Sequence, residues 1–549
     1  MNNKNLSYVD VAPSDSYLKD RTKKEQELIK KLSNDVDIDS VKKELDFLHE
    51  YQNHRETPEE TACMPSLLPS DIDSNIDLIR TEVSIIKNKD EDVTYVKNIE
   101  NTNNIVYMEV LIPTDVLSPE DYLYLPFFSY CATNSGWNGK DWSTCSEESA
   151  ITFGNLFSRL HCSERSSSEH ALKVEESVAN KNLFSRDWIS FAGNFLTEKT
   201  EDCFKLMAEV INTYDFSDKK RIRKLLIETR NGMRSSIIPR GNRFTGIRSR
   251  IGLCHSKTVD ELWYGLTQYF FIEKLYRTCP KKIIKRLNLI KEKLKKAGGI
   301  VHVVTNNESI ETFEKYLPNF ISEIDLKNLA PKKPVAESEF EKLTLLKNEK
   351  TIPNFEVFTT SSQVGYASSS MVASANSTKN SSAEIVLTHW LSGTYIWEKV
   401  RTTGGAYGAS ASINALSKIC SFTTYRDPSP LKSVETFNEI LKEAAEIKLS
   451  KEECDKLITG TYGEEYQPFA PSGKGRLGLL QLLSSVSNAD SEQKIQNLLS
   501  ITPEDVQLAA KRILENSKKS KVAILGDKSL KKTVQNKAKK TSVIINLPL

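Results

Sequence analysis

The sequence predicts an α+β fold in which two homologous domains, each an antiparallel-rich sheet packed with helices, follow a helical hairpin. Three observations support this. The chain has 549 residues, which is too many for a single hydrophobic core. From about residue 80, short β-rich runs alternate with amphipathic helical segments. The same order of elements then recurs roughly 200 residues later, as expected of two similar domains.

The hairpin is predicted over residues 1–75. Residues 14–33 are rich in Lys, Glu and Leu and carry an interrupted apolar stripe. SVKKELDFLHEYQ then places Val41, Leu45 and Leu48 at helical spacing, with Asp39 or Ser40 as the N-cap. Most of this surface is polar, so we expect the antiparallel hairpin to pack on something larger.

The first domain is predicted over residues 76–328. The predicted strands are TEVSIIK, NIVYMEVLIP, AITFGNLFSRLHC, SRDWISFAGNFLT and the closing, buried GIVHVVTN. One predicted helix, SPEDYLYLPFFSYCATN, opens with a capping box formed by Ser118 and Asp121. The other predicted helices are EDCFKLMAEVINTY, DKKRIRKLLIETRNGMRSSI and the basic run 281–297. A stretch bearing lysine and proline, LAPKKPVAESEFEKL, predicts a linker over 329–350.

The second domain is predicted over residues 351–549. FEVFTTSSQVGYASSSMVAS, GASASINALSKICSFTTYRD and KVAILGD are predicted as strands. The predicted helices are SAEIVLTHWLSGTYIWEKVR, SPLKSVETFNEILKEAAEI, SKEECDKLITGTYGEEY and TPEDVQLAAKRILEN. GKGRLGLLQLL lacks the Lys-Ser/Thr step of a phosphate-binding loop and is predicted to start a helix.

Composition excludes several classes of function. Seventy-five basic residues against 73 acidic ones leave a net charge of +2, which gives no reason to expect a nucleic acid or an anionic membrane as a partner. No run of 18 apolar residues and no secretory h-region is present. Nine cysteines without a C-x-x-C pair indicate a reducing compartment. We therefore expect a cytoplasmic or organelle-matrix location.

The sequence predicts no metal site in this chain. A helical zinc protease needs two histidines on one helix face with a glutamate beside them, and none of the seven histidines has another four positions on. The nearest approach is HCSER, where Glu164 is followed by Arg165, which cannot ligate a metal. His302 is predicted to be a strand residue and His389 a helix-packing residue. The sequence also lacks a G-x-S-x-G elbow and a G-x-G-x-x-G turn after a strand.

The strongest lead is WEKVRTTGGAYG, residues 397–408. Arg401 ends a predicted helix, Gly404 and Gly405 permit strained backbone or a close approach, and Tyr407 begins the next strand. One interpretation is a helix C-cap followed by a strand. The other is a guanidinium and a phenol that donate hydrogen bonds to a peptide carbonyl, which stabilise most once the carbonyl becomes an oxyanion.

The segment WEKVRTTGGAYGASASIN, followed by FTTYRDP (422–428), resembles the C-terminal half of presequence proteases and falcilysin-like enzymes. These belong to the pitrilysin and insulin-degrading-enzyme family of zinc peptidases. The similarity runs along nearly the whole chain. It implies a helical linker at 14–56 and 64–72, a third domain at 80–325 and a fourth at 351–549.

The resemblance also implies functional residues and partners. In this family two bowl-shaped halves close around a peptide, and the N-terminal half holds zinc through H-x-x-E-H and a distal glutamate. The C-terminal half contributes an arginine and a tyrosine, which correspond to Arg401 and Tyr407, with Gly404, Gly405 and Ala406 as substrate contacts. No metal is expected on this chain, and the chain alone is expected to be inactive.

Two departures from the family accompany the resemblance. The segment 118–134, where the zinc half would carry its metal motif, contains no histidine, and IIPRGNRFTGIRSRIG (237–252) differs from the His-Ser-Tyr-type segment of the branch. Since the zinc half would precede Met1, we expect either a split enzyme or a fragment of a longer one.

The resulting prediction is the substrate-binding half of a zinc-dependent oligopeptidase that degrades unstructured peptides such as targeting peptides. One alternative is a non-catalytic peptide-binding or structural subunit of a protease-family complex. A further alternative is an independent hydrolase with an unrecognised triad.

Overall fold

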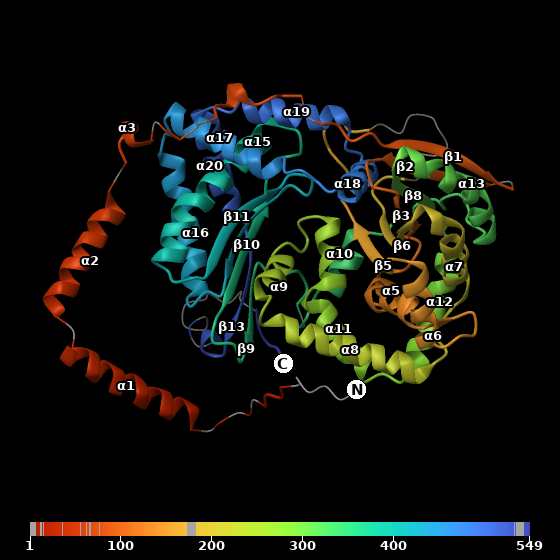
Figure 1. Cartoon of the computed structure of the whole chain (residues 1–549), viewed down its shortest axis with the longest axis horizontal. Helices are drawn as coiled ribbons and strands as arrows, with labels where there is room; N and C mark the ends of the chain where they lie inside the picture. The colour runs from red at the N-terminus through yellow and green to blue at the C-terminus, as the bar shows by residue number, and fades with distance from the viewer. Residues whose placement is uncertain are drawn as a thin grey trace. The chain divides into compact units, whose positions relative to one another are not determined.

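The computed structural model describes the whole chain except residues 1–6, 11, 13, 15, 36, 55, 62, 65–66, 76, 90, 173–182, 348, 532, 534–542 and 549. It divides into two units, Met1–Ser66 and Leu67–Leu549 (Figure 1). In the described part of the chain, no helix combines the length and the apolar character needed to cross a bilayer.

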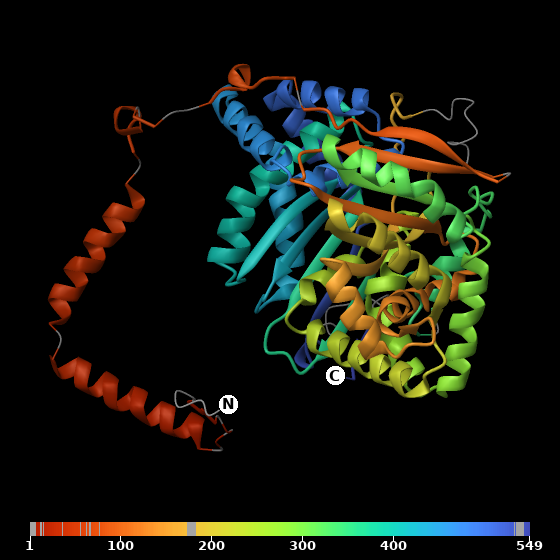
Figure 2. The same cartoon turned by 45° about the vertical axis from the view of Figure 1, so that its right-hand side comes forward.

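The first unit contains α1 (Tyr17–Asp35), α2 (Ile38–Asn53) and α3 (Pro58–Thr61). Asp37 caps α2 by accepting a hydrogen bond from the Asp39 N–H, so the predicted cap at Asp39 or Ser40 is wrong. α1 and α2 follow one another at an angle, as Figures 1 and 2 show, and the predicted antiparallel pairing is not formed among the described residues. Their apolar stripes, which include Leu28 and Leu45, are interrupted by charged residues and stay exposed.

The first sheet of the second unit has the order β1-β2-β8-β3-β6-β5. Its strands are β1 (Glu82–Asn88), β2 (Glu91–Ile99), β3 (Ile105–Pro113), β5 (Asn155–Cys162), β6 (Asp187–Leu196) and β8 (Ile300–Thr305). All neighbours are antiparallel except β2 and β8. The run GIVHVVTN forms β8, which is buried throughout in the middle of the sheet, as its continuous apolar character predicts.

Helices bury one face of this sheet in a large apolar core. Ser118 and Asp121 form the predicted capping box at the start of α4. The helices are α4 (Pro119–Tyr122), α5 (Leu125–Asn134), α6 (Trp142–Thr152), α7 (Thr200–Thr213), α8 (Lys219–Ile237), α10 (His255–Tyr264), α11 (Leu266–Tyr276), α12 (Pro280–Leu294), α13 (Asn307–Glu323) and α14 (Glu337–Leu343). The short strands β4 (Gly136–Trp137) and β7 (Tyr214–Asp215) pair beside them.

The other face of the first sheet is covered by α18 (Pro471–Leu483), which comes from far along the sequence. This helix is the predicted GKGRLGLLQLL segment. A Cβ at Gly475 would lie 2.4 Å from the Val304 side chain, and one at Gly478 would lie 2.5 Å from Thr81. The glycines therefore let the helix approach β2 and β8 closely, and they serve packing rather than phosphate binding.

The second sheet has the order β11-β12-β10-β13-β9-β14. Its strands are β9 (Phe355–Thr360), β10 (Tyr366–Val372), β11 (Gly408–Asn414), β12 (Ile419–Tyr425), β13 (Lys521–Asp527) and β14 (Val543–Asn546). β9 pairs in parallel with β13 and β14, and the other neighbours are antiparallel. One face is buried under helices α15 (Lys379–Leu391), α16 (Pro430–Glu446), α17 (Lys451–Glu465), α19 (Asn488–Leu499) and α20 (Pro503–Ser517).

The opposite face of the second sheet carries α9 (Gly241–Arg248), which Figure 1 shows between the two sheets. Thr245 hydrogen-bonds Ser368 at 3.0 Å, and Ser249 hydrogen-bonds Ser370 at 2.7 Å. Arg248 is buried and donates to both carboxylate oxygens of Glu356 on β9 and to Glu261 on α10. The segments predicted as separate domains thus exchange elements, and the predicted boundaries at 76–328 and 351–549 remain a prediction.

Candidate functional site

The segment that begins the candidate site is a helix that changes its winding. α15 runs into a π-helix over Ser392–Thr402, in which the Thr403 N–H reaches back to the Glu398 carbonyl at 2.8 Å. The Gly405 N–H bonds the Arg401 carbonyl, and Gly405 lies at φ +78°. A Cβ at Gly404 would lie 2.5 Å from the Val400 carbonyl oxygen. The two glycines therefore end the helix, and wide π turns of this kind occur frequently at functional sites.

Arg401 lies at this helix end, half-buried, with its guanidinium carbon 3.7 Å from the centre of the Trp397 ring. It forms no ion pair or side-chain hydrogen bond with any residue that the structure describes. Stacking on the indole one turn earlier holds the side chain while its N–H donors stay unused. Sequence reasoning overlooked Trp397, although its spacing of four residues from Arg401 on a helix was the signal.

Tyr407 lies at the other end of the same loop and is 68% exposed. Its ring packs edge-on against Tyr425, with the centroids 5.9 Å apart, and its N–H donates to the Arg426 carbonyl. Its hydroxyl has no partner among the described residues. Arg426, in the left-handed region at φ +48°, is exposed beside these rings and was not predicted as a site residue.

Ala406 lies in this loop but is only 3% exposed. Its side chain packs into the core beneath the second sheet, and its N–H donates to the Val400 carbonyl. The structure therefore removes its side chain and its N–H as substrate contacts, because the loop turns the methyl group inward. Gly404 and Gly405 stay near the surface.

The strand that follows the loop, β11, is an edge strand, because only β12 pairs with it. The Ser392 hydroxyl occupies one point on its outer edge: it accepts from the Ala411 N–H at 2.9 Å and donates to the Ala411 carbonyl at 3.2 Å. In an antiparallel pair, residues two apart direct their N–H and C=O to the same side, so Ala409 also presents its backbone outward, next to Tyr407. An extended peptide could add to the sheet here.

A second group of reactive side chains, which we name the acid–histidine network, lies in the first sheet's region. It consists of Tyr122, Cys162, Asp187, His255 and Glu337. Asp187 accepts hydrogen bonds from Tyr122, Cys162 and His255 at 2.7–2.9 Å. The other nitrogen of His255 lies 2.7 Å from Glu337 on α14. Both carboxylate oxygens of Asp187 and both ring nitrogens of His255 are thus already in use.

Cys162, Asp187 and His255 are the one group of possible metal ligands found among the described residues. Burial raises the pKa of the Cys162 thiol well above its usual value, so the sulfur keeps its proton. Burial alone would lower the pKa of His255, but Asp187 and Glu337 outweigh it and raise the pKa to about 10. A metal needs a thiolate and a neutral imidazole, so this donor set fits an ion-pair network rather than a metal centre.

The other histidines behave as predicted. His302 in β8 is buried between Asn98 and Glu109, at 3.0 and 3.3 Å. His389 in α15 pairs with Glu464 at 3.0 Å on the neighbouring α17. Burial and then the charge of Arg476 lower the pKa of His161 in β5 to about 4, so this histidine is neutral at physiological pH.

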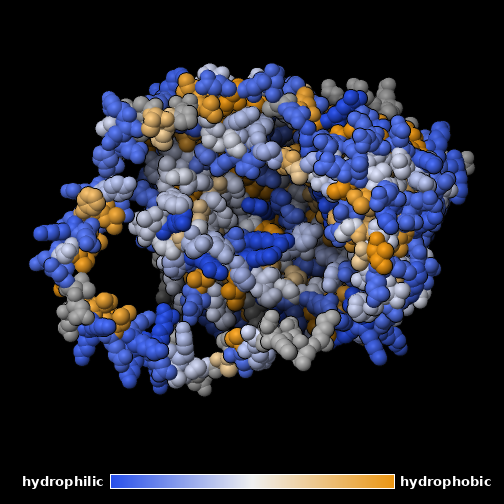
Figure 3. Space-filling view, in the orientation of Figure 1, coloured by the Kyte–Doolittle hydropathy of each residue, from blue (hydrophilic) through white to orange (hydrophobic). Residues whose placement is uncertain are grey.

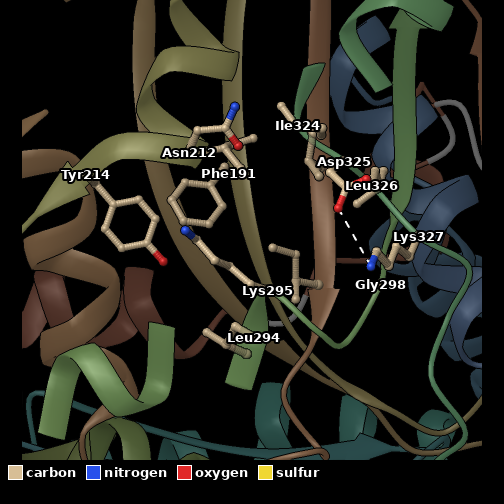
Figure 4. A pocket seen from close by; sticks show the side chains of 13 residues that line it. Phe191, Asn212, Tyr214, Leu294, Lys295, Gly298, Ile324, Asp325, Leu326 and Lys327 are labelled. Carbon is tan, nitrogen blue, oxygen red and sulfur yellow. Dashed lines mark ion pairs between the residues drawn. The ribbon is translucent and has the colours of Figure 1, made fainter. Parts of the chain in front are cut away.

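A cavity of about 200 Å³ lies between the first sheet and the helices that cover it (Figure 4). The rings of Phe191 and Tyr214 line it on one side, and the ion pair between Asp325 and Lys327, at 3.7 Å, lies on the other. The Asn212 amide donates to the Glu323 carbonyl. Since these polar groups have partners within the chain, we interpret the cavity as a gap in packing rather than a ligand site.

Comparisons with known proteins agree with this architecture. Residues 11–275 match a family model for the region associated with peptidases of family M16, subfamily C, and residues 355–527 match the "PreP C-terminal domain". The chain is 24% identical over 513 residues to the mitochondrial presequence protease of Schizosaccharomyces pombe, covering 93% of this chain and 48% of that protein. It is 25% identical over 486 residues to that of Saccharomyces cerevisiae, covering 86% of this chain and 45% of that protein.

The chain thus spans about half the length of the curated relatives it matches. Among solved structures, a conserved protein from Enterococcus faecalis V583 aligns with a TM-score of 0.56 at 11% identity. That alignment covers 79% of this chain and 97% of the other, which shows a shared fold.

Proposed function

Because this chain belongs to the presequence-protease group of the M16 peptidases, we propose that it is the substrate-binding half, without zinc, of an oligopeptidase. Its substrates would be unstructured peptides such as targeting peptides. The observation that carries the proposal is the loop 401–407: an unpaired guanidinium stacked on Trp397 and an exposed phenol stand directly before an open sheet edge.

Each group has a distinct role in this proposal. The outer edge of β11 pairs with the extended backbone of the peptide, which selects chains without stable fold. Arg401 donates to a peptide carbonyl near the scissile bond, and its contact with Trp397 limits the side-chain freedom lost on binding. The Tyr407 hydroxyl donates to the same region as charge develops on the carbonyl oxygen.

Zinc would supply the chemistry of bond cleavage from a partner half with an H-x-x-E-H motif, joined covalently or bound as a separate subunit. The described residues of this chain do not fit a catalytic zinc site. α5, which follows the first sheet's third strand, contains no histidine, and Asp187 and His255 are committed to each other. We also propose the division into domains at 76–328 and 351–549, a linker at 329–350, and a connection to the zinc half through residues 1–75.

Reconstitution tests this function. The chain is combined with an M16 half that bears H-x-x-E-H, and the cleavage of an unstructured peptide is followed. We expect Tyr407→Phe to lower kcat about 10- to 100-fold, in the lower range of the losses found when one oxyanion donor is removed. Arg401→Gln should reduce kcat/KM by a similar factor.

Tyr316→Phe is a matched control, because its hydroxyl donates to Glu201, away from the loop. Arg277→Gln is the corresponding control for the charge. If Tyr407→Phe cleaves peptides at the wild-type rate, the tyrosine has no catalytic role. Peptide binding without enhanced cleavage would favour a non-catalytic subunit instead.

A further inference from the structure

A second pocket lies between α5, α8, α9, α10 and α11 and has a volume of about 370 Å³, the size of a small-ligand site. Apolar and aromatic side chains form its walls, among them Met233, Phe244, Trp263 and Tyr264. It is therefore shaped to take an apolar side chain. The segment that contributes Phe244, 237–252, is the one that departs from the family pattern.

Polar groups on the inner wall of this pocket have no partner. Gln268 is 1% exposed, and neither its amide oxygen nor its amide nitrogen has a hydrogen-bond partner. The indole N–H of Trp263 is buried and unpartnered as well. Buried amides and indoles are nearly always satisfied, so unpartnered groups beside a cavity indicate a ligand with polar atoms.

The mouth of the pocket is positively charged. Arg240 and Arg243 are exposed there, and neither forms an ion pair with a residue in the described ranges. The Arg243 guanidinium lies 5.7 Å from the centre of the Tyr264 ring. The single carboxylate, Glu228, accepts a hydrogen bond from Tyr130 at 3.3 Å. Two unpaired guanidinium groups beside an apolar cavity suit a carboxylate attached to an apolar group.

The pocket lies on the peptide side of the second sheet. Thr245 of α9 bonds Ser368, whose register partner on β12 is Thr423, and Thr423 in turn faces Ser410 on β11. α9 and Ser410 therefore share one face of the sheet, which is also the face of Tyr425, the ring partner of Tyr407. Figure 3 shows this side of the second unit as a hollow, with hydrophilic side chains where Figure 1 draws α9 and α10.

We propose that this pocket binds the carboxyl-terminal residue of a peptide. Arg240 and Arg243 hold the α-carboxylate, the aromatic walls hold an apolar side chain, and the Gln268 amide meets the last peptide group. The inference rests on the proposed function, in that such a residue would belong to a peptide lying along β11. It assigns this chain a preference for peptides with a free carboxyl end.

The experiment uses the full chain and small probes, so that it does not depend on peptide cleavage. Binding of N-acetyl-phenylalanine, of its amide, and of N-acetyl-glutamate α-amide is measured by calorimetry. The free acid should bind at least tenfold more tightly than the amide. The glutamate derivative, whose carboxylate is on the side chain, should bind as weakly as the amide, which separates a chain terminus from an acidic side chain.

Variants assign the preference to the pocket. Arg240→Gln/Arg243→Gln should abolish the preference for the free acid, whereas Arg277→Gln, another exposed arginine, should keep it. Gln268→Leu should weaken binding of the free acid and leave the melting temperature equal or higher, because it removes an unsatisfied buried amide. Equal binding of acid and amide, a preference that survives the double substitution, or no binding of the free acid each overturns the inference.

The two proposals can fail separately. If N-acetyl-phenylalanine binds as expected but the reconstituted enzyme cleaves no peptide, the pocket stands and the peptidase function fails. If peptides are cleaved in a manner that depends on Tyr407 but the probes do not bind, the peptidase function stands and the pocket assignment is wrong.

Discussion

The acid–histidine network and the loop 401–407 contain similar side chains but differ in what their polar groups contact. In the network, Asp187 and His255 satisfy each other and their neighbours. In the loop, Arg401 touches only an indole face, and the Tyr407 hydroxyl has no described partner. A saturated network stabilises the fold, whereas unpaired donors beside an open edge are available to a ligand. Reactive residue types alone therefore do not locate the site; the missing partners do.

The strongest way to break a saturated network is to remove the buried arginine that joins α9 to the second sheet. Arg248→Met leaves Glu261 and Glu356 buried without their counter-charge. We expect a loss of about 3–5 kcal/mol in the free energy of unfolding, as found when one partner of a buried pair is removed. Chemical denaturation measures it.

A triple variant supplies the control. Replacing Arg248, Glu261 and Glu356 together with apolar residues of similar size should recover most of the loss, because no charge stays buried. If the single variant is as stable as the wild type, the ion pairs do not hold α9 on the sheet.

The next effect concerns the acid–histidine network itself. His255→Gln removes the positive charge between Asp187 and Glu337 and should lower the free energy of unfolding by about 2 kcal/mol, less than for Arg248 because the ring is partly exposed. A matched variant, His389→Gln, breaks a more exposed pair with Glu464 and should cost clearly less. Equal losses would contradict the distinction between the two histidines.

The same histidine predicts a pH dependence. Its pKa is raised to about 10 in the folded chain by Asp187 and Glu337 against the effect of burial, from 6.5 in the unfolded chain. Its stabilising contribution is thus complete below pH 6.5 and disappears as the pH rises through 10. The carboxyl of Asp187 has a lowered pKa, because His255 outweighs burial, so its contribution is lost at acid pH.

Denaturation at several pH values checks this expectation. The stability difference between the wild type and His255→Gln should shrink between pH 6.5 and 10. Burial holds the pKa of Cys162 and Tyr122 well above their usual values, so these groups do not dominate that window. A difference that stays constant across the window would show that His255 does not titrate as an ion-pair partner.

The sequence predicted much of the local structure, because local signals determine it. The apolar run of β8 and the capping box of Ser118 and Asp121 are read directly from neighbouring residues. Strand β2 was missed because EDVTYVKNI begins and ends with charged or polar residues. The pairing of α1 with α2 was predicted wrongly, since an interrupted apolar stripe does not specify what covers it.

The site was predictable only in part for the same reason. Arg401 and Tyr407 lie close in sequence, so the loop between them could be recognised from one motif. The burial of Ala406 depends on the core beneath β11, and the pocket of Gln268 depends on five helices meeting in space. Neither follows from spacing along the chain.

The smallest effect on stability should come from the open loop. Arg401→Gln and Tyr407→Phe remove groups that contact little of the protein, so each should change the free energy of unfolding by no more than about 0.5 kcal/mol. Trp397→Leu should also be nearly neutral for folding, because the indole is largely exposed, but it removes the surface on which Arg401 rests. We therefore expect a several-fold rise in KM for the reconstituted enzyme with an unchanged melting temperature. A large loss of stability in any of these variants would mean that the loop, like the acid–histidine network, serves the fold.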